Sequence, residues 1–128
     1  MSLPNIKEYI VDTVNLNFSD PSFNVQELSY QLRISGSYLR ELTIIHFGVN
    51  PQKYIETRRL EYSLELLKDE LLVRDIATRA GYNSIHSFEY AFKKRINIAP
   101  GRMKEILKKS PTKSSRIVQI YKKKLFNV

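Results

Sequence analysis

The sequence predicts an all-α protein, and three observations support that prediction. Apolar residues recur at helical spacing along almost the whole chain of 128 residues, as at Ile6, Ile10 and Val14. No stretch shows the sustained alternation of apolar and polar residues that is typical of a half-buried strand. The four glycines fall at expected turns, caps or helix starts. We therefore expect about seven helices followed by a basic C-terminal tail.

The helix boundaries are predicted from residues that favour helix ends. Asn24 as N-cap and Glu27 three residues later form a capping box, and Asn50 before Pro51 opens the longest helix. Gly48 is expected to end the third helix in the left-handed conformation. The expected helices cover about residues 6–15, 25–32, 36–47, 51–68, 73–80, 85–96 and 100–109.

The apolar pattern of the first half recurs in the second half. Ser29 corresponds to Ala77 at an offset of 48, and Gly48 corresponds to Asn97 at an offset of 49, with one extra residue in the second turn. A short helix, a tight turn and a second helix occur in each copy, which indicates two helix-turn-helix units. The expected division is residues 1–109 for the domain, with unit one over 6–48, a long linking helix over 51–68 and unit two over 72–109, and residues 110–128 for the tail.

Positive charge is concentrated near the C-terminus. Residues 1–101 carry equal numbers of basic and acidic side chains, so residues 102–128 account for the whole net charge of +8. Such a tail fits an anionic partner, although terminal lysines are also common simply as solvated residues. The tail contains apolar residues at near-helical spacing. It is therefore expected to be an extra helix on the domain, an arm on a neighbouring copy or a segment that binds the DNA backbone. That apolar set is Ile117, Ile120, Tyr121, Leu125 and Val128.

Several classes of chemistry are disfavoured by what the chain lacks. There is no cysteine, and the two histidines, His46 and His86, lie forty residues apart without acidic partners at ligand spacing. No glycine-rich phosphate-binding loop and no nucleophile motif occurs. The longest apolar runs are two or three residues, far below the roughly 18 needed to cross a bilayer. We therefore expect neither an enzyme, nor a metal or cofactor, nor a membrane protein.

Five motifs carry a resemblance to a known family. They are Ile34-Ser35-x-x-Tyr38-Leu39, Phe47-Gly48-Val49-Asn50-Pro51-x-x-Tyr54-Ile55, Ile76-Ala77-x-x-x-Gly81-Tyr82, Phe88-x-x-x-Phe92-Lys93-Lys94 and Ala99-Pro100. Over about residues 6–108 the chain resembles the DNA-binding domain of AraC/XylS-type transcription regulators. The resemblance implies sequence-specific binding of double-stranded DNA by two recognition helices, which enter successive segments of the major groove.

Matched to the family position by position, the outward residues of the two recognition helices are the expected DNA contacts. Arginine can bind a guanine with two hydrogen bonds, carboxylates accept from cytosine, aliphatic side chains touch thymine methyls and lysines bind phosphates. The expected contact residues are Ser37, Arg40 and Glu41 in unit one, and Ile85, His86, Glu89, Tyr90, Lys93 and Lys94 in unit two. The run Lys93-Lys94-Arg95 is expected to contact phosphates rather than to form a plain solvated patch.

Departures from the family pattern fall mainly in unit one. Members usually carry Arg, Phe and Lys where this chain has Glu41, Thr43 and Ile44, so unit two is expected to dominate DNA affinity. Arg33 stands where a turn glycine is common. Arg59, on the inner side of the linking helix, is expected to pair with a carboxylate, either as a structural bridge or as part of a DNA contact. Phe88 and Phe92 are expected to be core residues.

The resemblance also carries expectations about the whole protein. Family members normally place a sensor or receiver domain before this one, so we expect an excised C-terminal piece of a longer cytoplasmic regulator. RNA polymerase is a further candidate partner. Activation is the working hypothesis for its role, with repression left open. The alternative reading is a helical protein-interaction module that keeps the scaffold but has little affinity for DNA. The near-neutral residues 1–101 motivate that alternative.

Overall fold

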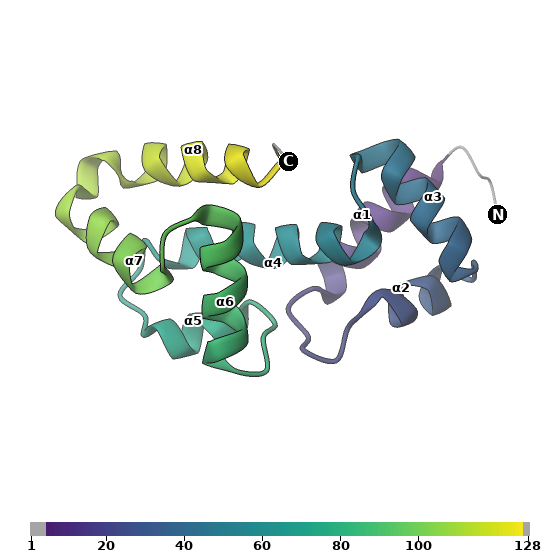
Figure 1. Ribbon diagram of the computed structural model, residues 1–128, viewed down its shortest axis with the longest axis horizontal. Helices are drawn as coiled ribbons and strands as arrows, with labels where there is room; N and C mark the ends of the chain where they lie inside the picture. The colour runs from purple at the N-terminus through teal and green to yellow at the C-terminus, as the bar shows by residue number, and fades with distance from the viewer. Residues whose placement is uncertain (1–4, 127–128) are drawn as a thin grey trace.

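The structure, a computed structural model, describes residues 5–126, and all regular elements within them are helices (Figure 1). The all-α prediction is confirmed. A short 3-10 helix, η2 (Pro111–Lys113), precedes the last α-helix. The α-helices are α1 (Ile6–Asn17), α2 (Val25–Leu32), α3 (Gly36–Phe47), α4 (Pro51–Leu66), α5 (Val73–Arg79), α6 (Ile85–Ile96), α7 (Pro100–Lys109) and α8 (Ser114–Phe126).

The boundaries follow the local signals closely. Asn24 accepts a hydrogen bond from the Glu27 backbone N–H at 2.8 Å, and Asn50 accepts one from the Lys53 N–H at 2.8 Å. These caps satisfy amide groups that have no partner inside the helix. Three ends differ from expectation. Helix α1 runs two residues further than predicted, α4 ends at Leu66 rather than near residue 68, and α5 ends at Arg79 rather than at residue 80.

Helix α4 connects two separate hydrophobic cores. Its first half places Tyr54 and Ile55 in a core shared with α1, α2 and α3, and its second half places Leu60 and Leu64 in a core shared with α5 to α8. Figure 1 shows α1, α2 and α3 around one end of α4, and α5, α6 and α7 around the other. The chain is thus two small cores on one continuous helix.

The C-terminal segment is a helix that packs on the domain, so the first of the three alternatives for the tail is observed. Helix α8 lies along α4 (Figure 1), and its Val118 and Leu125 side chains are buried in the second core. Lys122 of α8 forms an ion pair with Glu65 of α4 at 2.5 Å. Val128, the last member of the predicted apolar set, lies outside the described residues.

Candidate nucleic-acid interface

Helix α3 presents its predicted contact residues on one exposed face. The Ser35 hydroxyl caps the helix by accepting from the Tyr38 N–H at 3.1 Å, and Gly48 ends it at a φ of 75°. Leu39, Leu42 and Thr43 are buried against the first core. Burial of that face leaves the opposite one to solvent, and the exposed candidates on it are Ser37, Arg40 and Glu41.

Helix α6 is built in the same way in unit two. The Ser84 hydroxyl caps the helix by accepting from the Ser87 N–H at 3.1 Å. Phe88 and Phe92 are fully buried, as predicted, with their ring centroids 5.6 Å apart. The candidates His86, Tyr90, Lys93 and Lys94 are exposed, and Ile85 and Glu89 are partly exposed.

The two turns that precede these helices share one hydrogen-bonding pattern. The Ile34 N–H donates to the Ser29 carbonyl at 3.1 Å, and the Tyr82 N–H donates to the Ala77 carbonyl at 3.0 Å. Each turn contains a residue in the left-handed region, Arg33 at a φ of 58° and Gly81 at 95°. The repeat seen in the sequence is therefore a repeat of backbone structure.

The basic run at the end of α6 does not act as one patch. Lys93 and Lys94 are exposed, and the Lys94 ammonium lies 5.8 Å from the centre of the Tyr90 ring. Arg95 instead turns inward, where it pairs with Glu56 of α4 at 2.6 Å and donates to the Leu125 carbonyl of α8 at 2.9 Å. Arg95 thus joins α6 to α4 and α8 and is not free to contact phosphates. The expectation that the whole run Lys93-Lys94-Arg95 contacts phosphates is therefore wrong for Arg95, and only the two lysines stay candidates.

Arg59 has no carboxylate partner among residues 5–126, contrary to expectation. Its guanidinium donates to the carbonyls of Phe18 at 2.7 Å, Asp20 at 3.1 Å and Phe23 at 2.9 Å, all in the segment that joins α1 to α2. Burial lowers the pKa of Arg59, and the Tyr82 hydroxyl and the Asp20 carboxyl partly offset that shift. Three carbonyl oxygens replace the water that this charge loses, so its role is structural.

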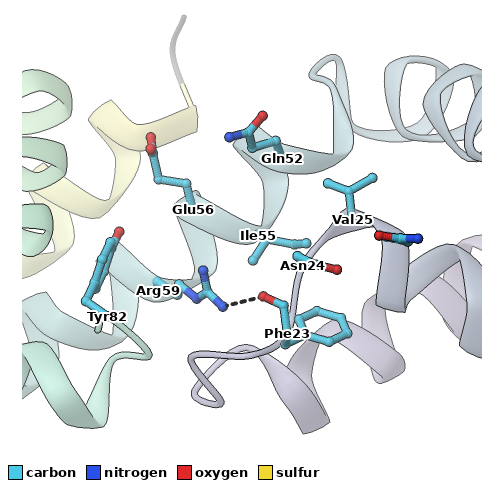
Figure 2. A pocket seen from close by; sticks show the side chains of 9 residues that line it. Phe23, Asn24, Val25, Gln52, Ile55, Glu56, Arg59 and Tyr82 are labelled. Atoms are coloured by element: carbon cyan, nitrogen blue, oxygen red, sulfur yellow. Dashed lines mark hydrogen bonds between the residues drawn. The ribbon is translucent and has the colours of Figure 1, made fainter. Parts of the chain in front are cut away.

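A cavity of about 490 Å³ separates the two units on one side of α4 (Figure 2). The Tyr82 hydroxyl beside it is buried and has no hydrogen-bond partner within the described residues. A second cavity, of about 220 Å³, shares Val25 and Gln52 with the first and is also lined by Gly36 and Arg40. The exposed start of α3 therefore lies beside the cavity between the units. The first cavity is lined by Phe23, Asn24, Val25, Gln26, Gln52, Ile55, Glu56, Arg59 and Tyr82.

The predicted contact residues thus form two sets, one on α3 and one on α6, and no hydrogen bond or ion pair within residues 5–126 links the sets. Sequence reasoning missed the long-range roles of Arg95 and Gly81, for which nothing local gives a signal. Among the described residues, no group of three His, Asp or Glu is placed to hold a metal ion. None of the described helices has the length and apolar character needed to span a bilayer.

Comparison with known proteins bears directly on this arrangement. A family model described as a helix-turn-helix domain matches residues 28–106, from α2 into α7. The chain belongs to the AraC-type helix-turn-helix family. Members of this family are DNA-binding transcription regulators rather than enzymes. The matched residues begin within α2, include the rest of both helix-turn-helix pairs and stop before α8.

Relatives and solved structures agree with the AraC-type assignment. The chain is 27% identical over 122 residues to YfiF of Bacillus subtilis, a protein described as an uncharacterized HTH-type transcriptional regulator. That match covers 94% of this chain but 37% of YfiF, so the chain spans about a third of the length of this relative.

Two solved C-terminal domains of response regulators have the same fold. The domain of yesN from Fusobacterium nucleatum is 32% identical, with a TM-score of 0.73, and the match covers 76% of this chain and 95% of that one. The domain of AraT from Geobacillus stearothermophilus is 26% identical, with a TM-score of 0.70, and the match covers 80% of this chain and 85% of that one. The AraC-type chain described here therefore shares the fold of domains that lie at the C-terminal ends of those regulators.

Proposed function

We propose that this chain is the sequence-specific DNA-binding domain of a bacterial transcription regulator, with α3 and α6 entering successive segments of the major groove. One observation carries the proposal: two capped helices, each with a buried face and an exposed polar face, lie at the two ends of one helix in a chain of the AraC-type family. Major-groove segments on one face of DNA repeat every ~34 Å, a separation suited to two helices joined in this way.

The proposed contacts divide by chemistry. Ser37, Arg40 and Glu41 on α3 are assigned to base edges, because they lie on the exposed face near the start of a recognition helix. The same assignment is made for Ile85, His86, Glu89 and Tyr90 on α6. Lys93 and Lys94, further along α6, are assigned to phosphates, which position a protein without reading sequence.

The C-terminal segment is proposed to add affinity without specificity. Its exposed cations include Lys113, Arg116, Lys123 and Lys124, all outside the two recognition helices. Cations in such positions can meet only the DNA backbone. In this division, residues 1–109 form the DNA-binding domain, and residues 110–128 form a basic segment whose helix α8 is docked onto it.

The whole regulator is proposed to be longer than this chain. The two solved neighbours are C-terminal domains of response regulators, and YfiF is about three times as long as the matched region. A receiver or sensor domain before α1, action on transcription in the bacterial cytoplasm as an activator and contact with RNA polymerase are consistent with this setting.

Selection of bound duplexes from a random pool, followed by titration of the selected site at several salt concentrations, tests the proposed function. The logarithm of the association constant should fall linearly with the logarithm of the salt concentration. The slope should be about −0.9 for each phosphate that the protein neutralises. Lys93→Ala should weaken specific and random duplexes about equally and reduce that slope by about one, whereas Arg40→Ala should relax the selected motif at one position.

The matched control is Lys7→Ala on α1, which removes the same charge outside both helix-turn-helix pairs and should leave the slope unchanged. Enrichment of no motif, together with no salt-dependent binding of duplex DNA, would overturn the proposal in favour of a protein-interaction module. If Lys93→Ala left affinity intact while Arg40→Ala abolished it, the dominance of unit two would be wrong.

A further inference from the structure

We propose that Arg59 and Gly81 form a rigid joint between the two helix-turn-helix units and thereby set the separation of DNA half-sites that the protein accepts. The inference rests on the proposed function, because half-site separation has meaning only if both recognition helices bind DNA. Arg59 is a positioning residue in this proposal. Its guanidinium N–H groups donate to backbone carbonyls of the protein. Its effect on DNA binding is exerted through the orientation of α3 relative to α6.

Arg59 ties the segment between α1 and α2 to the middle of α4. Its Nε donates to the Phe18 carbonyl, and its Nη2 donates to the carbonyls of Asp20 and Phe23, at distances of 2.7, 3.1 and 2.9 Å. Figure 2 shows the guanidinium between the segment that carries Phe23 and the Tyr82 ring, with the bond to Phe23 drawn. A planar guanidinium that meets three fixed carbonyls holds the segment in one position.

The segment is itself stiff. The Asp20 carboxylate accepts from the Ser22 N–H at 2.9 Å and from the Ser22 hydroxyl at 2.8 Å, which closes a short turn. The Phe18 ring packs edge-on against the Tyr62 ring of α4, with the ring centroids 5.5 Å apart. Unit one therefore offers a preformed surface at this point, not a loose loop.

Gly81 brings unit two against that same segment. A Cβ at Gly81 would lie 2.3 Å from the Phe18 carbonyl oxygen and 2.9 Å from the Arg59 Nε, closer than any real side chain can approach. The next residue, Tyr82, places its ring 5.9 Å from the Arg59 guanidinium, and the same ring packs on Phe88 of the second core with the ring centroids 5.4 Å apart. The turn of unit two, Arg59 and the backbone of unit one thus meet at one point.

This joint bears on DNA because of the geometry of the double helix. One inserted base pair moves a half-site by about 3.4 Å along the axis and rotates it by about 34°. A flexible pair of units could follow that change, whereas a rigid pair would lose the contacts of one recognition helix. The joint therefore converts backbone packing far from the bases into a preference for one spacing.

The DNA test uses the whole chain and the motif obtained from selection, with the two halves of the motif separated by zero, one or two extra base pairs. Wild-type affinity should fall about tenfold or more for one added pair, because the base contacts of one helix are lost. In Arg59→Lys one flexible ammonium replaces the planar fork whose Nε and Nη2 donate from two fixed positions, so the segment is held less firmly and the same insertion should cost less than about threefold. Circular dichroism establishes that each variant is folded.

Two controls separate the joint from general effects. Tyr82→Phe keeps the ring over Arg59 and removes a hydroxyl that has no partner within the described residues, so it should keep the wild-type spacing profile. Arg74→Lys, an exposed exchange of the same kind on α5, should also keep it. A merely structural role for Arg59 would lower affinity at every spacing by the same factor and would leave the ratio between spacings unchanged.

A second measurement needs no DNA and uses the absence of cysteine from the chain. Tyr30→Cys on α2 and Arg79→Cys on α5, both at exposed positions, allow one spin label on each unit. Pulsed electron spin resonance should give a narrow distance distribution in this labelled protein and a broader one when Arg59→Lys is added. A broad distribution with Arg59 intact overturns the joint, whatever the variants do.

The outcomes distinguish the two proposals. Failure of the wild type to bind any selected duplex overturns the proposed function, and the label distances still decide whether the joint exists. Specific binding with a spacing profile that Arg59→Lys leaves unchanged overturns the joint and leaves the proposed function standing.

Discussion

The two helix-turn-helix units have the same backbone plan but differ at equivalent positions. Unit one has Arg33 in its left-handed turn position where unit two has Gly81, and it has Thr43 in its core where unit two has Phe92. In addition, the buried residues of α8 within the described part of the chain, Val118 and Leu125, belong to the second core. The repeated sequence pattern therefore determines the backbone of each unit, while the residues packed around each unit determine which side chain is tolerated at a given position.

The turn shows this most clearly. Arg33 is exposed, so a side chain fits there despite the left-handed backbone. Gly81 faces the Phe18 carbonyl, where a Cβ would stand at 2.3 Å. A glycine is required at the second turn by a contact with the other unit, and no such contact constrains the first turn.

The largest expected difference lies in the cores. Phe92→Ala should lower the free energy of unfolding by about 3 to 5 kcal/mol, because it removes a fully buried ring, whereas Thr43→Ala at the equivalent position should cost only about 1 kcal/mol. Urea denaturation followed by circular dichroism measures both. A Phe92→Ala protein that stayed as stable as the wild type and lost only DNA binding would show that the ring is not a core residue.

The next largest effect is expected at the second turn. Gly81→Ala should cost about 2 kcal/mol or more, since it adds a collision with Phe18 to the strain of a φ of 95°. Gly48→Ala is the matched control, because its φ is 75° but a Cβ there would meet nothing within 4 Å. Its cost should be close to 1 kcal/mol. Equal losses in thermal denaturation would mean that the close approach contributes nothing.

The first turn should respond in the opposite direction. Arg33→Gly should raise the free energy of unfolding by up to about 1 kcal/mol, because relief of the left-handed strain outweighs the entropy that glycine loses on folding. Asn97→Gly, at a φ of 68°, should gain less, since asparagine tolerates this conformation. Destabilisation by Arg33→Gly would indicate that the arginine side chain makes a stabilising contact.

The smallest effect concerns the attachment of α8 to unit two. Hydrogen bonds from Lys122 and Lys68 lower the pKa of Glu65 below its ordinary value of 4.5. Because the pKa of Glu65 is lowered in the folded state, the contribution of its ion pairs to the free energy of unfolding is fully present above about pH 4.5. That contribution is lost as the pH falls through the folded-state pKa. The stability difference between wild type and Glu65→Gln, below about 1 kcal/mol for such half-exposed pairs, should shrink from pH 7 to pH 3. A difference that stays constant would contradict the role of this ion pair.

Local signals explain why so much of the fold could be predicted from the sequence. The caps at Asn24 and Asn50 and the stop at Gly48 depend on residues within one turn of helix, and all three are confirmed. The internal repeat then predicted two units on a linking helix. The DNA contacts remain predictions, because exposure of Arg40 or Lys93 is compatible with any partner.

Contacts between distant residues explain what could not be predicted. Arg59 meets carbonyls about forty residues earlier, and backbone carbonyls leave no trace in a sequence, so a carboxylate was expected instead. Arg95 was assigned to a basic patch because Lys93 and Lys94 precede it, but its position on α6 points it at Glu56 and Leu125. The apolar spacing of the tail predicted a helix without indicating the surface on which it packs.

The continuity of α4 through both cores has a consequence for local opening of the protein. Amide protons near either end of α4 can exchange with solvent when one unit opens, because only that unit covers them. Those near Arg59, at the meeting point of the two units, become accessible only when both have opened. Their opening free energy approaches the sum for the two units, so the middle of α4 is expected to retain its protons longest in deuterated water.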